Sequence, residues 1–85
     1  MDSEQVKERI ESALRGKCFV SEFSGGNDHY SVVVVCEQFS RKKPLHRHRM
    51  IMDLFKAEID SGEVHALTIH AYTPDEWEKK FKTQL

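Results

Sequence analysis

Residues 29–36 have the sequence HYSVVVVC, and the stretch from Val32 to Cys36 is the longest apolar run of the chain. Its length and its β-branched residues are typical of a strand. The turn before it, SGGND at 24–28, is dense in turn-forming residues, and residues 18–23 have the character of a partner strand. These segments together predict an antiparallel β-hairpin.

An amphipathic helix of about four turns is predicted before the hairpin, because apolar residues recur there at helical spacing between Glu and Lys. This apolar stripe has four members: Val6, Ile10, Ala13 and Leu14. Asp2 and Gln5 have the spacing of a capping box, and Gly16 is expected to stop the helix.

A second helix is predicted after the hairpin, because Pro44 suits a first helical position and apolar residues follow at i, i+3, i+4 and i+8. They are Ile51, Leu54, Phe55 and Ile59, and the helix is expected to stop near Ser61-Gly62. Residues 64–72 then alternate as in a strand, with Leu67, Ile69 and Ala71 on one face.

The last helix is predicted to begin at Thr73-Pro74-Asp75-Glu76, where Thr73 caps, Pro74 occupies the first turn and Glu76 closes a capping box. Trp77 and Phe81, four residues apart, are expected to form its buried stripe.

The predicted order is α-β-β-α-β-α. Since the second and third strands are joined through a helix, they should run parallel with a right-handed crossover. We expect an α+β fold with a three-stranded mixed sheet, helices mainly on one face, and one domain over residues 1–85.

Two histidines are placed by this topology at one rim of the sheet. His29 opens the second strand and His65 lies near the start of the third, so adjacent parallel strands would bring them about 5 Å apart. Two ligands are too few for a closed structural zinc site, but they suit a metal centre shared with a second molecule. The alternative is that His65, which shares strand parity with Leu67 and Ile69, simply caps the core.

The other three histidines give weaker signals. His70 falls on the opposite strand face and is expected at the surface. His46 and His48 are two residues apart on a predicted helix, where such positions do not face each other, so solvated side chains are expected.

A basic segment surrounds the start of the second predicted helix. Five cations fall within nine residues: Arg41, Lys42, Lys43, Arg47 and Arg49. Such a segment could contact a phosphate backbone or an acidic protein surface, or could be a solvated face balanced by nearby carboxylates. No interleaving of aromatic and basic residues along the chain indicates base stacking.

The composition excludes several classes of protein. The chain has 85 residues, of which 39% are hydrophobic and 32% charged, with a formal net charge of −1. It is therefore neither a disordered chain nor a strongly basic nucleic-acid binder. Residue patterns typical of a P-loop, a nucleophile elbow or a dinucleotide site are absent from the sequence, so we expect no enzyme.

Cys18 and Cys36 form no C-x-x-C pair, and we expect both to be buried small hydrophobic residues. A hairpin symmetric about Asn27 would set them opposite each other, and a shift of one residue would remove that pairing. The sequence shows no secretory signal and no apolar run of the roughly 18–20 residues that span a bilayer. A reducing compartment follows, by default the cytoplasm, with the nucleus or an organelle left open.

Several blocks in a fixed order resemble the BolA family over nearly the whole chain. They begin with HYSVVVV at 29–35 and Phe39. The most specific blocks follow: RHRMI at 47–51, VHALTI at 64–69 and TPDEW at 73–77. The resemblance implies an α-β-β-α-β-α fold related to the type II KH fold, which agrees with the order predicted above.

The resemblance also implies a partner and a cofactor. BolA-like proteins pair with monothiol glutaredoxins and share a [2Fe-2S] cluster, with a histidine ligand in the block that maps to His65. The second ligand comes from the loop between the first two strands, and in Ser24 to His29 only His29 is a candidate. The alternative is that His65 binds alone, with glutathione and the glutaredoxin cysteine completing the iron sites. We expect a monomer without a cluster when the chain is alone, and a heterodimer with the partner.

The family is further linked to DNA binding and transcriptional regulation, and the resemblance places that role in the basic segment. The residues concerned are Arg41, Lys42, Lys43, Arg47, His48 and Arg49. Many relatives have a glycine near Arg41, and its replacement here leaves the shape of the turn open while adding a positive charge.

Overall fold

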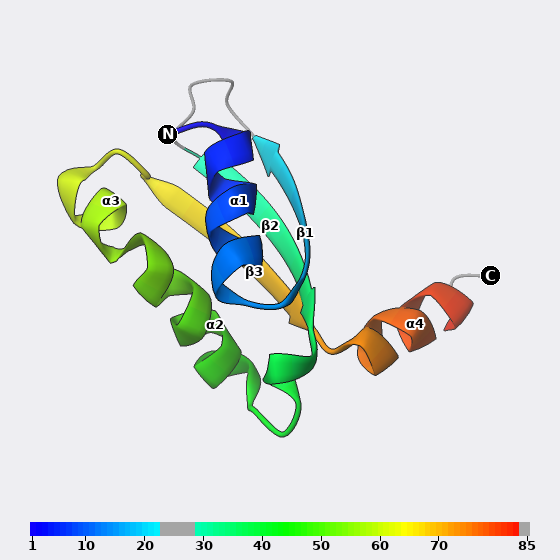
Figure 1. Cartoon of the computed structure of the whole chain (residues 1–85). Helices are drawn as coiled ribbons and strands as arrows, with labels where there is room; N and C mark the ends of the chain where they lie inside the picture. The colour runs from blue at the N-terminus through cyan, green and yellow to red at the C-terminus, as the bar shows by residue number, and fades with distance from the viewer. Residues whose placement is uncertain (23–28, 84–85) are drawn as a thin grey trace.

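The computed structural model describes residues 1–22 and 29–83, and it has the predicted order of helices and strands, shown in Figure 1. Short 3₁₀ turns occupy Glu37–Phe39 and Asp53–Phe55. The regular elements are α1 (Ser3–Ala13), β1 (Gly16–Glu22), β2 (His29–Cys36), α2 (Pro44–Met52), α3 (Lys56–Ser61), β3 (Ala66–Tyr72) and α4 (Pro74–Thr83). The predicted turn at 24–28 lies outside the described residues.

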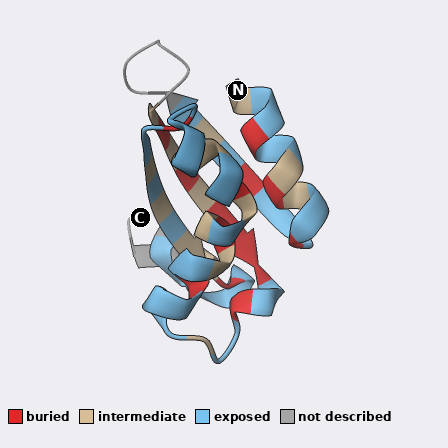
Figure 2. Ribbon diagram, turned by 90° about the vertical axis from the view of Figure 1, so that its left-hand side faces the viewer, coloured by how far each residue is buried: buried red, intermediate tan, exposed pale blue. Residues whose placement is uncertain are grey.

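The three strands form one mixed sheet in the order β1-β2-β3, as predicted. β1 pairs antiparallel with β2, and β2 pairs parallel with β3. Helices α1, α2 and α3 lie over one face of the sheet, whereas α4 extends from its end on the other side (Figures 1 and 2). This arrangement fits the expected α+β class with helices mainly on one face.

The core fills the space between the sheet and α1, α2 and the 3₁₀ turns, where Figure 2 shows the buried positions. Its largest fully buried side chains are those of Tyr30, Phe39 and Phe55. Burial of these apolar surfaces is the main force that stabilises the fold. None of the helices in the described ranges combines the length and apolar composition needed to cross a bilayer.

The capping box of α1 is confirmed, but the predicted role of Gly16 is wrong. The Asp2 carboxylate accepts from the Gln5 amide at 2.9 Å, and the Gln5 side chain accepts from the Asp2 amide at 2.9 Å. The helix ends at Ala13, and Gly16 begins β1 instead. A Cβ on Gly16 would lie 2.1 Å from the Val35 carbonyl oxygen, so glycine is required by the close approach of β2.

The second predicted helix is interrupted between α2 and α3. The 3₁₀ turn has a tighter pitch than an α-helix, and it carries Phe55, whose side chain is fully buried. Gly62 ends α3 with a φ of 83°, in the left-handed conformation that favours glycine, so the predicted stop is confirmed.

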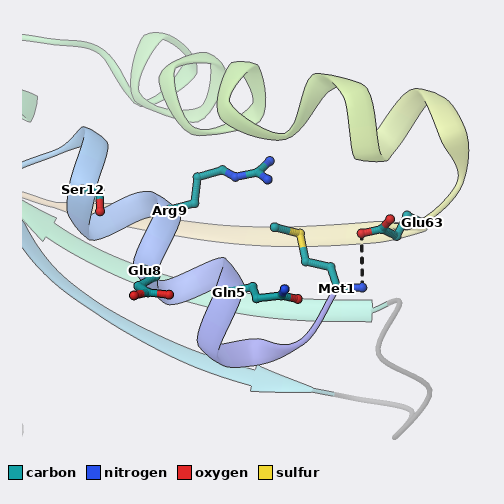
Figure 3. Close-up of a pocket in the computed structure, with 6 residues that line it drawn as sticks. All are labelled: Met1, Gln5, Glu8, Arg9, Ser12 and Glu63. Carbon is teal, nitrogen blue, oxygen red and sulfur yellow. Dashed lines mark ion pairs between the residues drawn. The ribbon is translucent and has the colours of Figure 1, made fainter.

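Arg9 joins α1 to this interrupted helix. Its guanidinium donates to the Glu58 carboxylate at 2.6 Å and to the Leu54 carbonyl at 3.0 Å, and it lies 5.2 Å from the Phe55 ring centroid. The hydrogen bond from Arg9 lowers the pKa of the Glu58 carboxyl. Arg9 also lines a groove of about 410 Å³ next to α1, and Figure 3 draws the residues around it.

The two cysteines are buried, as expected, but they do not face each other. Cys18 pairs with Val34 and Cys36 pairs with Gly16, so the hairpin is shifted by two residues from one symmetric about Asn27. Both thiols are free. Burial, and secondarily the Glu11 carboxylate, raises the pKa of the Cys18 thiol to about 11, so the reactive thiolate is disfavoured.

Candidate functional site

His29 and His65 lie side by side at one rim of the sheet. His29 is the first residue of β2, and His65 directly precedes β3, whose Ala66 is the register partner of His29. The two imidazole centroids are 6.0 Å apart, with 30° between the ring planes. The predicted convergence of the two imidazoles is confirmed, and it follows from the parallel pairing of β2 and β3.

Both rings are accessible from solvent. His29 is half-buried and His65 is exposed, so the alternative that His65 caps the core is wrong. The sequence placed His65 within the third strand, but β3 begins one residue later. A Cβ on Gly62 would still lie 3.9 Å from His65 Nε2, which leaves this side of the imidazole uncrowded.

Val64, which lies between α3 and β3, holds the neighbouring His65 in position. The Val64 side chain is 2% exposed, and its amide donates to the Glu58 carbonyl at 3.0 Å. His65 therefore projects from a buried and hydrogen-bonded neighbour. Such support limits the positions that its imidazole can take.

A charged pair lies near this rim. The Met1 amine is 3.2 Å from the Glu63 carboxylate, as Figure 3 shows, and the Tyr30 hydroxyl donates to the Met1 carbonyl. Tyr30 follows His29, and Glu63 comes two residues before His65. The Glu63 carboxylate is thus engaged by a cation close to the two imidazoles.

The histidine pair can fill only part of a metal's coordination shell. Within residues 1–22 and 29–83, no group of three or more His, Cys, Asp or Glu side chains could hold a metal ion. A metal centre at this rim would take its remaining ligands from outside the described residues. Neutral imidazole nitrogens are suitable donors for iron, zinc and copper.

The basic segment is mostly exposed at the start of α2. Arg41, Lys43, His48 and Arg49 are exposed, and Lys42 is half-buried. Lys43 is the N-cap of α2 and makes no side-chain cap, so helix N–H groups lie beside these cations. A groove of about 370 Å³ runs along α2, and Leu45 on its wall is 63% exposed.

Arg47 does not belong to that exposed surface, which corrects its predicted role in binding a partner or nucleic acid. It is 8% exposed, and its guanidinium donates to the carbonyl oxygens of Lys42 at 2.9 Å and Ala71 at 3.2 Å. It also donates to both carboxylate oxygens of Glu76, at 2.6 and 3.1 Å. All of these contacts are internal, so Arg47 joins α2, β3 and α4. The sequence did not reveal this role of Arg47, because its basic neighbours in the sequence are exposed.

Glu76 shows the electrostatic effect of this contact. Hydrogen bonds from Arg47, and then from the Thr73 backbone, lower the pKa of the Glu76 carboxyl to about 2. Glu76 also closes the predicted capping box, accepting from the Thr73 amide at 2.9 Å while the Thr73 hydroxyl accepts from the Glu76 amide at 3.2 Å. The capping prediction for α4 is confirmed.

Arg41 holds the turn before α2 in an unusual backbone conformation. Its φ is 63°, the left-handed region that most residues avoid and that glycine adopts freely. The resemblance places a glycine near here in many relatives. The turn is left-handed at Arg41 even though an arginine occupies it.

Trp77 lies outside the core, contrary to prediction. It stacks on Phe19, with ring centroids 6.1 Å apart, and contacts Tyr72 in a tilted arrangement with centroids 5.3 Å apart, on the sheet face opposite α1. The Phe81 side chain, predicted to share its stripe, lies outside the described part of the chain. Strand parity could have revealed this cluster, because Phe19 and Cys18 alternate and only one of them can face the core.

Comparisons with known proteins agree on one family. A family model described as BolA-like protein matches residues 3–76. The chain is 37% identical to a protein of Escherichia coli (strain K12) named DNA-binding transcriptional regulator BolA, over 86% of this chain and 80% of that protein. It is 41% identical to BolA-like protein 1 of Mus musculus over 64% of this chain, but this covers only 39% of the mouse protein. A crystal structure of a bol-like protein from Babesia bovis matches with a TM-score of 0.84 and 32% identity, covering 95% of this chain and 94% of that one.

Proposed function

Because the chain belongs to the BolA-like protein family, we propose that it is a non-enzymatic adaptor that pairs with a monothiol glutaredoxin. The two proteins would share a [2Fe-2S] cluster, in iron–sulfur trafficking or in iron and redox regulation. His65 and His29 are the proposed ligands from this chain. The observation that carries the proposal is the pair of accessible imidazoles 6.0 Å apart at one rim of the sheet.

The donor set fits a shared cluster. Two histidines on one iron are chemically sound, as Rieske centres show, and they raise the reduction potential relative to ligation by thiolates alone. This chain brings two imidazoles to an accessible rim, where a partner could supply thiolates from its cysteine and from glutathione. When bound, the cluster would supply one-electron redox chemistry and a transferable iron–sulfur unit.

In such a complex, this chain would hold the two imidazoles in place and keep them accessible to the partner. The parallel pairing holds His29 next to the segment that carries His65, and buried Val64 holds that segment against α3. The neutral ring nitrogens of these two histidines would be the atoms that bind the iron.

The test is reconstitution of the heterocomplex with a monothiol glutaredoxin and glutathione, followed by visible circular dichroism. His65→Ala should change the spectrum most, and His29→Ala should change it in the same bands. His70→Ala is the matched control, because His70 is an exposed histidine within β3. A wild-type spectrum from His65→Ala would remove His65 from the iron, and failure of wild type to form a coloured heterocomplex would refute the partnership.

A second candidate function is transcriptional regulation through DNA binding at the basic segment. It is favoured by the name of the Escherichia coli relative and by the exposed cations Arg41, Lys43 and Arg49. Affinity for duplex DNA should then fall steeply with salt, and Lys43→Gln and Arg49→Gln should each reduce the salt dependence by about one counterion. No binding to duplex DNA at low salt would exclude this function.

A further inference from the structure

The sheet face opposite α1, α2 and α3 is open over most of its length. Strand parity and register place on it residues 17, 19 and 21 of β1, the odd-numbered residues of β2 and the even-numbered residues of β3. In the described strands, none of these positions is Asp or Glu, whereas Lys17, His29 and His70 are among them. α4 covers only one end of this face (Figures 1 and 2).

We propose that this open face binds single-stranded nucleic acid. The proposal goes beyond the glutaredoxin adaptor, and it concerns a different surface from the basic segment, because α2 lies on the other side of the sheet. Proteins that bind single strands combine cations with aromatic rings on which bases stack. Both features meet here.

The aromatic part of the face is Phe19, supported by Trp77. Phe19 is 52% exposed, an unusual value for a phenylalanine, and its ring is nearly parallel to that of Trp77, with 24° between the planes. Tyr72 supports Trp77 at 5.3 Å, and the Lys80 ammonium lies 5.1 Å from the Tyr72 ring centroid. The stack holds Phe19 in place while much of its surface remains available to a base.

A groove beside Phe19 supplies space and charge. It has a volume of about 380 Å³, and its apolar lining includes Phe19, Val35 and Trp77. Arg15 and Lys17 also line it, against one carboxylate, Glu37. Its volume lies in the range of sites for small ligands, and the excess of cations suits a ligand that is both flat and anionic.

The edges of the sheet favour a nucleic acid over an added peptide strand. At β1, the Cys18 amide donates to the Glu11 carboxylate at 3.1 Å, and at β3 the Ala71 carbonyl accepts from Arg47 at 3.2 Å. A peptide that extends a sheet needs free edge groups, and charged side chains at an edge oppose such pairing. Duplex DNA is disfavoured as well, since its bases are stacked inside and cannot reach Phe19.

Phe19, Tyr72 and Trp77 come from distant segments, so the sequence alone does not show that they meet on this face. Strands of seven residues at about 3.3 Å each are about 23 Å long, enough for a few nucleotides. The near-neutral net charge of −1 predicts weak binding that depends on this local arrangement.

The test uses a fluorescently labelled short oligothymidine and the full chain at low salt. Anisotropy measures binding, and Trp77, the single tryptophan, reports contact near Phe19 through its own fluorescence. Wild type should bind with quenching of Trp77. Phe19→Ala should weaken binding about tenfold through loss of stacking.

A second variant leaves the aromatic cluster intact. Ser21→Glu adds a carboxylate to the open face two residues from Phe19, and it should weaken binding at least fivefold. Ser12→Glu is its matched control, because it makes the same change at an exposed position on α1 and should stay within twofold of wild type. This pair remains decisive if Phe19→Ala loosens α4.

Four results would overturn the proposal. The first is that wild type does not bind oligothymidine at low salt, and the second is that Ser21→Glu and Ser12→Glu weaken binding equally. The third is that Lys43→Gln abolishes binding while Ser21→Glu binds normally. The fourth is that a polyglutamate peptide competes as effectively as unlabelled oligothymidine. The last would indicate a general site for acidic chains. None of them bears on cluster assembly with a glutaredoxin, so the two proposals fail independently.

Discussion

Arg47 and Glu76 form a two-point ion pair, with distances of 2.6 and 3.1 Å, that fastens the first turn of α4 to α2. Two of the sequence blocks that carry the family resemblance, RHRMI and TPDEW, therefore meet in space. Arg47 anchors the start of α4, which extends away from the core and also contacts the sheet through Trp77 and Lys80.

Replacing Arg47 by alanine should destabilise the protein by about 2–3 kcal/mol, because two carbonyl oxygens and the Glu76 carboxylate lose their donor. For a chain of 85 residues this corresponds to a fall in Tm of roughly 8–24 °C. Arg49→Ala, two positions away and exposed, should stay within about 0.5 kcal/mol of wild type. Thermal unfolding followed by circular dichroism makes the comparison, and equal losses in both variants would contradict the role of Arg47.

The Glu76 carboxylate should make stability depend on pH in the acid range. Its pKa falls from 4.5 to about 2 on folding, so its stabilising effect is complete above about pH 5 and disappears as the pH drops through 4.5 towards 2. Because the side chain is 45% exposed, we expect only about 1 kcal/mol after screening by solvent. The free energy of unfolding of Glu76→Gln, measured by urea titration, should approach that of wild type as the pH falls. A gap that persists unchanged at pH 2 would show that the ion pair is not its cause.

Arg41→Gly should stabilise the protein by about 0.5–1 kcal/mol. A residue with a Cβ is strained at a φ of 63° by about 1–2 kcal/mol, and glycine removes that strain at some cost in the entropy of the unfolded chain. Lys42, one residue later, has no positive φ that glycine could relieve, so Lys42→Gly should destabilise the protein. Urea unfolding of both variants tests the sign, and a loss of stability in Arg41→Gly would mean that its side chain makes an essential contact.

Gly16→Ala should cost more than an alanine normally does in a strand. The added Cβ would fall 2.1 Å from the Val35 carbonyl oxygen and 3.0 Å from the Cys36 Cα, so β1 and β2 must separate there. We expect a loss of about 1–3 kcal/mol by thermal unfolding. At Gly62 the space is open and only the φ of 83° opposes alanine, so Gly62→Ala should lose about 1–2 kcal/mol. If Gly16→Ala lost no stability, β1 and β2 would be able to separate at this position at little cost in free energy.

Periodicity and capping predicted most of the fold because those signals are local. The capping boxes of Asp2 with Gln5 and of Thr73 with Glu76, and the crossover that brings His29 beside His65, all follow from short-range patterns and one topological rule. The features that were missed depend on contacts between distant segments. Gly16 was predicted to stop the helix, because the sequence around it does not reveal that Val35 of the neighbouring strand approaches it closely. Arg47 resembled its exposed basic neighbours because its acceptors lie on β3 and α4.

Pulsed EPR of the reduced heterocomplex, with ¹⁵N-histidine in this chain and an unlabelled glutaredoxin, measures directly whether His29 and His65 bind the cluster. We predict strong ¹⁵N hyperfine couplings from two directly bound imidazoles, the loss of one coupling in His29→Ala, and an unchanged spectrum in His70→Ala. A cluster that shows no ¹⁵N coupling from this chain would contradict the account, because the two imidazoles at the rim of the sheet would then not be its ligands.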